Sequence, residues 1–164
     1  YNYDIPNNPA FYTFNFRVIV IANYNSGQLL EECISSVITQ NFNDYELIMV
    51  DAGSTDESKQ TVLKYKDCFS WWCSEKDKGQ SDAFNKGFSH AKGDYFFWLN
   101  ADDFLLPNAL EKASKFIDKH PSCKWLTFNT IFVDSNRRVL FAYNGCKWFS
   151  CIMKKIGPQF YISS

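Results

Sequence analysis

The sequence lacks long apolar segments and blocks of like charge. Its longest apolar runs, such as Val18–Ala22 and Tyr95–Leu99, are far shorter than the roughly 18 residues that a membrane-spanning helix needs. No run of like charges reaches five residues, and 17 basic residues nearly balance 18 acidic ones. Nucleic-acid-binding proteins usually carry a basic excess or a basic stripe, so the net charge of −1 argues against a nucleic-acid partner.

Two common site motifs are also missing. The 6 cysteines contain no C-x-x-C pair, which zinc sites usually show, so we expect reduced, mostly buried thiols, as in a cytosolic protein. Residues 23–27 read Asn-Tyr-Asn-Ser-Gly, where a nicotinamide-binding Rossmann domain needs G-x-G-x-x-G. No basic-then-apolar leader precedes the first apolar run, and the chain begins with Tyr1 instead of Met, so we expect a piece of a longer protein.

The pattern that remains is an alternation of strands and helices within one domain-sized chain of 164 residues. Residues 1–15 look irregular. Beyond them, short apolar runs predict strands and helical spacing of apolar residues predicts helices, in the order strand 17–22, helix 28–40, strand 45–50, helix 55–65, strand 69–73, helix 81–91, strand 95–99 and a helix opening at Pro107. Such alternation implies an α/β fold with a mostly parallel sheet flanked by helices.

Local signals refine these boundaries. Ser54 and Glu57 have capping-box spacing at the second helix, Gly93 suits the end of the third, and Phe116 is expected to face inward from the fourth. The C-terminal part of the sequence does not continue this alternation. Its pattern resembles a β-hairpin, with strands at 125–133 and 139–143 and a turn at 134–137.

Acidic residues follow the predicted strands where ligands bind in open α/β sheets, outside the carboxyl ends. Asp51 follows the second strand and Asp77 the third, and the fourth leads to Asn100, Asp102 and Asp103. Clustered carboxylates repel one another unless a cation lies among them, and Asp oxygens suit Mg²⁺ or Mn²⁺ held together with substrate phosphates. Asp102 and Asp103 could instead belong to a turn or N-terminal cap before the helix that opens at Pro107. That alternative does not explain Asp51 and Asp77.

Four segments resemble family 2 glycosyltransferases, which have the GT-A fold. In chain order they read VIVIANYN (18–25), VDAGSTD (50–56), EKDKGQSDAFNKG (75–87) and GDYFFWLNADD (93–103). The resemblance implies that residues 16–164 form a GT-A domain, and we expect its C-terminal, acceptor side to be truncated.

The resemblance implies nucleotide contacts at the ends of the first two strands. Ala22 and Tyr24 would lie against the nucleotide, with the Tyr24 ring stacking on the base, although packing under the loop is also open for this ring. Asp51 would accept a hydrogen bond from a base N–H, or else cap the following helix. Asp56 suits the first turn of that helix without any ligand.

The same resemblance puts the third segment beside the nucleotide and the donor sugar. Asp77, Asp82 and Asn85 are the implied contacts, and Gly79 allows close approach of a ligand to the backbone. Lys86 would offset diphosphate charge or simply remain solvated.

Asn100-Ala101-Asp102 occupies the position of the family's Asp-x-Asp motif. Asp102 matches the metal-binding carboxylate, Asp103 is a further metal candidate, and Asn100 replaces the first Asp, where it keeps hydrogen-bonding capacity without charge. The implied cofactor is Mn²⁺ or Mg²⁺.

The implied activity is inverting transfer of a sugar from a nucleoside-diphosphate sugar, a UDP-sugar by expectation, to a hydroxyl of a carbohydrate or lipid-linked acceptor. The resemblance to the family implies that this transfer belongs to polysaccharide or glycan assembly. It also implies a cytoplasmic location, with peripheral association at the cytoplasmic face of a membrane. After Asp103 the acids are Glu111, Asp118 and Asp134, none a convincing general base, so we expect the base beyond Ser164. The competing hypotheses are a nucleotide-sugar-binding module without catalysis and a purely structural α/β domain.

Overall fold

The core of the fold is a twisted sheet in which four neighbouring strands run parallel. The computed structural model describes residues 17–127, 129–143 and 151–154, so the segment 1–15 lies outside the described residues. Its parallel strands are β1 (Arg17–Asn23), β2 (Tyr45–Asp51), β3 (Trp71–Ser74) and β4 (Tyr95–Asn100). They lie in the order β3-β2-β1-β4. Beyond β4, β8 (Cys151–Lys154) pairs antiparallel with β4, and β5 (Trp125–Thr127) pairs antiparallel with β8. The α/β class and the mostly parallel sheet are therefore confirmed.

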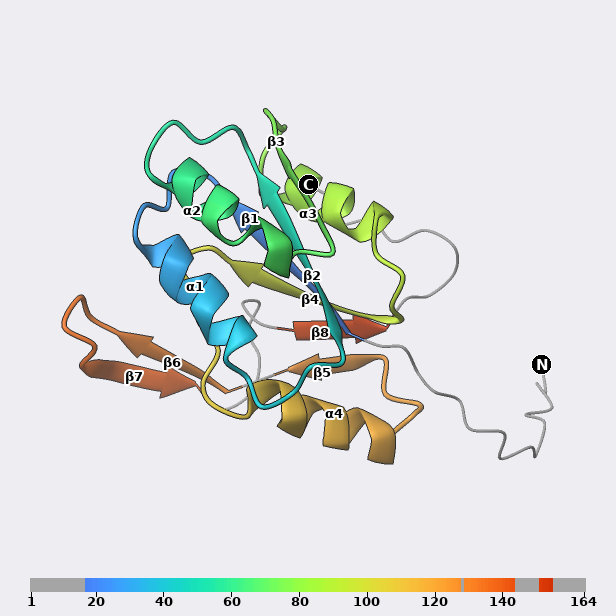
Figure 1. The fold of residues 1–164 in the computed structure, drawn as a ribbon. Coiled ribbons are helices and arrows are strands. Elements are labelled where there is room, and N and C mark those ends of the chain that lie inside the picture. Colours follow the sequence, from blue (N-terminus) through green and yellow to red (C-terminus); the bar gives the residue numbers. More distant parts are fainter. Residues whose placement is uncertain (1–16, 128, 144–150, 155–164) are drawn as a thin grey trace.

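Helices cover both faces of this sheet (Figure 1). They are α1 (Leu29–Ile38), α2 (Ser58–Lys64), α3 (Gln80–Ser89) and α4 (Ala109–Lys119), with one 3₁₀ turn at Lys66–Cys68. Apolar residues of α1, α2 and α4 pack with one set of strand side chains, whereas α3 packs with the other set. The alternation of side chains along a strand explains this division.

The first strand shows the division most clearly. Ile19 and Ile21 join the core under α1, while Val18 and Val20 join the core under α3, and all four are fully buried. A strand buried on both faces reads as a continuous β-branched run, which is why this strand was predictable from sequence.

The C-terminal part departs from the expected single hairpin. The segment 125–133 is two strands, not one: β5 pairs with β8 in the main sheet, and β6 (Thr130–Val133) pairs with β7 (Val139–Tyr143) in a separate two-stranded sheet. The hairpin itself is confirmed for β6 and β7. Its turn is held by Asp134, whose carboxylate accepts hydrogen bonds from the backbone N–H groups of Asn136 and Arg138 at 2.8 Å each.

Three local expectations are wrong. The α2 helix begins at Ser58, so Ser54 does not cap it. The Ser54 hydroxyl instead donates a hydrogen bond to Asp51. The α3 helix ends at Ser89, before Gly93, because backbone N–H groups of the next residues already bond to its last carbonyls. Phe116 is 41% exposed, so it lies at the margin of α4's buried stripe.

Cys33, Cys68 and Cys73 are free thiols, but the described cysteines are not mostly buried. Cys33 is buried, Cys68 is exposed, and Cys73 and Cys123 are half-buried, while the side chains of Cys146 and Cys151 lie outside the described set. Within the described residues, no helix combines the length and apolarity needed to cross a bilayer.

Gly87 lets α3 lie directly against the sheet. A Cβ at this position would stand 2.4 Å from Cγ1 of Val20 and 3.4 Å from Cγ2 of Ile48. The first distance is far below van der Waals contact, so the helix could not keep its present depth with any larger residue.

Gly87→Ala is therefore expected to lower the free energy of unfolding by about 1–3 kcal/mol, because overpacking outweighs the better helix propensity of alanine. Chemical denaturation measures this change. The control is Ser89→Ala on the exposed side of the same helix, which should stay within about 0.5 kcal/mol of the parent. Equal stability of Gly87→Ala and the parent would show that α3 does not pack at this depth.

Candidate functional site

The carboxyl ends of the parallel strands bring the predicted site segments to one edge of the sheet. In the β1–β2 register Asn23 lies opposite Asp51, and in the β1–β4 register Ala22 lies opposite Asn100. Ser74, at the end of β3, lies opposite Asp51 on its other side. The expected gathering of strand ends is thus confirmed, and the ends of β2 and β4 flank the end of β1.

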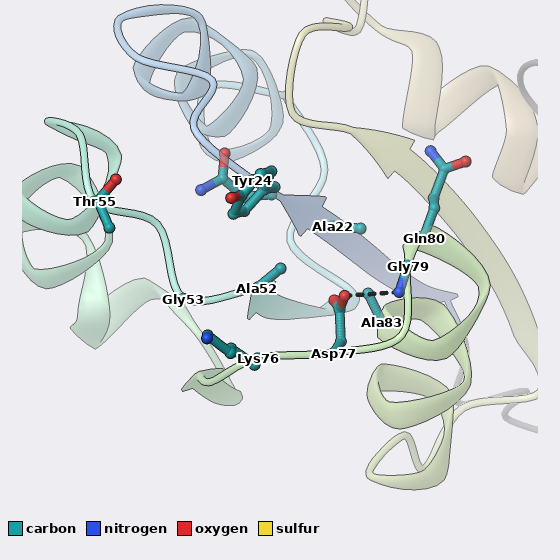
Figure 2. Close-up of a pocket in the computed structure, with 11 residues that line it drawn as sticks. Ala22, Tyr24, Ala52, Gly53, Thr55, Lys76, Asp77, Gly79, Gln80 and Ala83 are labelled. Carbon is teal, nitrogen blue, oxygen red and sulfur yellow. Dashed lines mark hydrogen bonds between the residues drawn. The ribbon is translucent and has the colours of Figure 1, made fainter.

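A cavity of about 730 Å³ opens at this edge. Its lining comes from the end of β1, from the loops that follow β1, β2 and β3, and from the first turn of α3. The lining residues are Ala22, Asn23, Tyr24, Ala52, Gly53, Thr55, Lys76, Asp77, Gly79, Gln80 and Ala83. Figure 2 shows Tyr24 on one side of the cavity, with Lys76 and Asp77 on the opposite side. A volume of this size is typical of small-molecule sites.

Tyr24 offers an open aromatic face to the cavity. Its side chain is 66% exposed, so it does not pack under the loop. Two hydrogen bonds to the loop after β2 fix the backbone beside Tyr24. Ser54 Oγ accepts a hydrogen bond from the backbone N–H of Asn25 at 2.9 Å, and Asn25 Oδ1 accepts one from the backbone N–H of Thr55. The backbone is thus fixed while the ring is available for stacking.

Asp51 lies beneath the cavity and is completely buried. Its carboxylate accepts four hydrogen bonds: from Asn23 Nδ2 at 2.7 Å, from the Ser54 N–H at 3.0 Å, and from the Ser54 and Ser74 hydroxyls at 2.5 Å each. These bonds fill the acceptor positions of a carboxylate. A base N–H can therefore reach Asp51 only if a serine hydroxyl turns away. Asp51 also does not cap α2, which begins seven residues later in the chain at Ser58.

Asn23 contributes a buried acceptor beside the cavity. Its Nδ2 faces the Asp51 carboxylate, which can only accept, so Oδ1 must be the atom that points away. That oxygen has no hydrogen-bond partner among the described residues. This acceptor could not be predicted from the sequence, because the orientation of the Asn23 amide depends on Asp51 in the neighbouring strand.

The loop between β3 and α3 is held by its own carboxylates. Asp77 Oδ1 accepts from the Gly79 N–H at 2.9 Å, and Asp82 Oδ2 accepts from the Lys78 N–H at 3.1 Å. Gly79 has φ of +110°, a conformation that suits glycine. Asp82 therefore already has a structural task at the start of α3, and it lies outside the cavity lining, as does the half-buried Asn85.

A chain of side-chain amides connects the cavity to the loop after β4. Gln80 Nε2 donates to Asn100 Oδ1 at 2.6 Å, and Asn100 Nδ2 donates to Asp103 Oδ2 at 3.0 Å. Burial and the neighbouring Asp102 raise the pKa of Asp103, although the bond from Asn100 works in the opposite direction. Asp102 is exposed. Asn100 thus lies between the cavity and the two acids.

The acids do not form a shared ligand cluster. No group of three or more His, Cys, Asp or Glu side chains suited to a metal is found in the described part of the chain. Asp51 and Asp77 are instead satisfied locally by hydroxyl and N–H donors. The expectation of three acidic loops around one cation is therefore wrong. The remaining pair, Asp102 and Asp103, fits Mg²⁺ or Mn²⁺, which takes one or two carboxylates together with substrate phosphates.

Several other charged residues have local partners. Lys86 forms an ion pair with Glu75 at 2.8 Å, so it is not simply solvated. Asp56 accepts from the backbone N–H groups of Gly27 and Ser58 ahead of α2. Of the cavity residues, sequence analysis assigned Ala22, Tyr24, Asp77 and Gly79 to the nucleotide, but it did not assign Asn23, Ala52, Gly53, Thr55, Lys76, Gln80 or Ala83.

Several known proteins are similar to this chain in sequence. An uncharacterised glycosyltransferase of Rickettsia typhi is 34% identical over 101 residues, which are 62% of this chain and 31% of that protein. The poly(ribitol-phosphate) β-N-acetylglucosaminyltransferase TarS of Staphylococcus aureus is 28% identical over 109 residues, 63% of this chain and 19% of TarS. This chain thus spans about a third or less of the length of these relatives.

Solved structures agree on the fold. The structure of TarS residues 1–349 in complex with UDP-GlcNAc aligns over 76% of this chain and 36% of that chain, with a TM-score of 0.62 and 23% identity. The mannosyltransferase PcManGT of Pyrobaculum calidifontis, in complex with GDP-Man and Mn²⁺, aligns over 66% of this chain and 34% of that chain, with a TM-score of 0.60 and 22% identity. The GT-A fold is thereby confirmed. Residues 18–155 also match the family model described as glycosyl transferase family 2, and the chain belongs to that family.

Proposed function

We propose that this chain is the donor-binding part of an inverting, metal-dependent glycosyltransferase that takes its sugar from a UDP-sugar. The observation that carries the proposal is the cavity at the ends of β1, β2 and β3, with an exposed tyrosine on one side and a pair of acids on the adjoining loop. One side suits a flat base, and the acids suit a metal-bound diphosphate. A Rossmann-type site for a nicotinamide cofactor would need a glycine-rich first loop, which is absent.

The nucleotide base would stack on Tyr24, the open aromatic ring of the cavity. Asp51 would accept the base N–H in place of one serine hydroxyl, because hydroxyl groups can rotate to a new partner. Ala22 and Asp77 would form further parts of the wall of the nucleotide site. Gly79 leaves space for a ligand beside its backbone, since an added Cβ would meet nothing within 4 Å. Asp82 and Asn85 remain our proposed contacts to the donor sugar side.

Asp102 and Asp103 would hold the metal, and Asn100 would hydrogen-bond a ribose hydroxyl. When bound, Mn²⁺ or Mg²⁺ supplies Lewis-acid stabilisation of the leaving diphosphate. Asp103 is held by Asn100 and partly buried, whereas Asp102 is exposed and available to a ligand. This chain's residues therefore bind and orient the donor, and the acids offer the negative charge that a cation needs.

The acceptor hydroxyl must lose a proton, and the three described acids that follow Asp103 are not suited to take it. Glu111 pairs with Lys115, Asp118 with Arg17, and Asp134 holds its own turn. We therefore assign the general base to residues outside those described, and the acceptor to a carbohydrate or lipid-linked hydroxyl in glycan assembly. A cytoplasmic location, with peripheral attachment to the membrane face, belongs to the same proposal.

The choice of UDP follows the relative TarS, an N-acetylglucosaminyltransferase whose residues 1–349 were crystallised in complex with UDP-GlcNAc. PcManGT was crystallised with GDP-Man, so guanine is the competitor to test. A nucleotide-sugar-binding module without catalysis shares every feature of the cavity. It differs in that the complete protein would show neither sugar transfer nor donor hydrolysis.

Calorimetric titration with UDP and GDP, in Mn²⁺ and in EDTA, tests the proposal. We expect UDP to bind, and Mn²⁺ to strengthen binding by roughly 5–150-fold, the usual range for coupling between two ligands. Asp102→Ala should remove most of that gain because it deletes an exposed carboxylate that does not support the fold. Asp67→Ala, an exposed acid on the 3₁₀ turn, is the matched control and should keep the gain. Equal UDP affinity in Mn²⁺ and EDTA would remove the metal from the proposal.

Tyr24 provides a second test that does not involve the metal. Tyr24→Ala should weaken UDP binding in EDTA by about 5–100-fold, since stacking of a base on an aromatic ring contributes about 1–3 kcal/mol. Tyr24→Phe keeps the aromatic face and should bind within about twofold of the parent. Melting temperatures should be unchanged, because the ring is exposed. A Tyr24→Ala variant with parental affinity would show that the base does not lie on this ring.

A further inference from the structure

The α1 helix carries a row of polar groups that face the loop after β4. Cys33, Ser36 and Gln40 follow one another at intervals of three and four residues, so they share one face of the helix and its end. All three bond to residues in or next to the loop 101–108, which carries Asp102 and Asp103. The partners lie 66 to 70 residues further along the chain.

Ser36 connects α1 to the middle of this loop. Its hydroxyl donates to the Cys33 carbonyl at 2.7 Å and accepts from the backbone N–H of Leu105 at 2.9 Å. Both functions of the hydroxyl are therefore used, and its orientation is determined. Leu105 stands two residues after Asp103, so the bond fixes the backbone just beyond the acids.

Gln40 holds the far end of the loop. Its side chain is nearly buried, and Nε2 donates to the Ser36 carbonyl at 2.9 Å and to the Leu106 carbonyl at 3.1 Å. Its Oε1 accepts from the Leu110 N–H at 3.3 Å. Asn108, the residue at the start of α4, makes no side-chain capping bond, so Gln40, in the turn that follows α1, supplies the acceptor that α4 lacks.

The start of the loop, at Asn100, is also fixed by a hydrogen bond from α1. Cys33 Sγ donates to the Asn100 carbonyl at 3.4 Å, and the same carbonyl accepts from the Asp103 N–H at 3.0 Å. Asp103 is additionally held by the Asn100 side chain. Asp102 is exposed, and no side-chain hydrogen bond to its carboxylate is found among the described residues. Its position is therefore determined by the backbone on either side of it.

We propose that Ser36 and Gln40 are positioning residues that set the backbone carrying Asp102 and Asp103 for metal binding. The inference rests on the proposed function, since it concerns the same acids. Mg²⁺-type coordination tolerates errors of about 0.2 Å in its ligand distances, so a loop held from outside at several points suits it. Loss of such supporting bonds typically weakens metal affinity about 10–100-fold.

A merely structural role for these bonds predicts a different result. If Ser36 and Gln40 only stabilise the fold, their removal lowers the melting temperature but leaves the coupling between metal and nucleotide intact. The positioning role predicts weaker metal binding with unchanged nucleotide binding in EDTA, because Tyr24 and Asp51 are held by other residues.

The experiment measures Mn²⁺ affinity of the protein–UDP complex by electron paramagnetic resonance of free Mn²⁺, and UDP affinity in EDTA by calorimetry. We expect Ser36→Ala to weaken Mn²⁺ binding by about tenfold while UDP affinity in EDTA stays within about twofold. Ser36→Thr retains the hydroxyl and should restore parental Mn²⁺ affinity. The matched control is Ser35→Ala, since that half-buried side chain on the same helix makes no bond to the loop.

Gln40→Glu keeps the proposal testable if Ser36→Ala does not fold. It retains an acceptor for Leu110 but loses the donor to Leu106, and we expect the same selective loss of Mn²⁺ affinity. Parental Mn²⁺ affinity in a folded Ser36→Ala or Gln40→Glu variant would overturn the inference while leaving the proposed function standing. A parent protein that binds UDP equally with and without Mn²⁺ would overturn the metal part of the proposed function, and this inference with it.

Discussion

The buried carboxylate of Asp51 is the group on which the site edge depends. An ionised carboxylate removed from water is costly unless hydrogen bonds replace its hydration. Here the donors come from Asn23 at the end of β1, Ser54 after β2 and Ser74 at the end of β3. One charge therefore fixes the relative positions of three strand ends, and these ends carry the walls of the cavity. A ligand that engages Asp51 must exchange one of these bonds for its own, so binding of any ligand to this carboxylate is linked to the order of this edge.

The α1 helix connects the core to the opposite side of the site. Its apolar residues Leu30, Ile34 and Val37 are fully buried against the sheet, while its polar row bonds to the loop after β4. Rigid secondary structure places functional groups more accurately than a free loop can. The acids are thus carried by a loop, but their position is set by a helix that belongs to the core.

The elements were largely predictable, because strands buried on both faces appear as continuous β-branched runs, as in Val18–Ile21. The separation of β5 from β6 was not, since β5 is defined by its pairing with a strand at 151–154 where the pattern is weak. Within the site, the motif segments contained Tyr24 and Asp77. The bonds of Ser36 and Gln40 could not be foreseen, because their partners are backbone atoms, which leave no trace in residue identity.

The position of β8 decides where this domain can be cut. That strand comes from the far end of the described chain, yet it lies between β4 and β5 and is the strand through which β5 joins the main sheet. A version shortened before Cys151 would leave β4 as an open edge, and its unpaired N–H and C=O groups would invite pairing with other molecules. A fragment of this chain that stops after the acidic loop would therefore expose this edge, even though it retains every residue that lines the cavity.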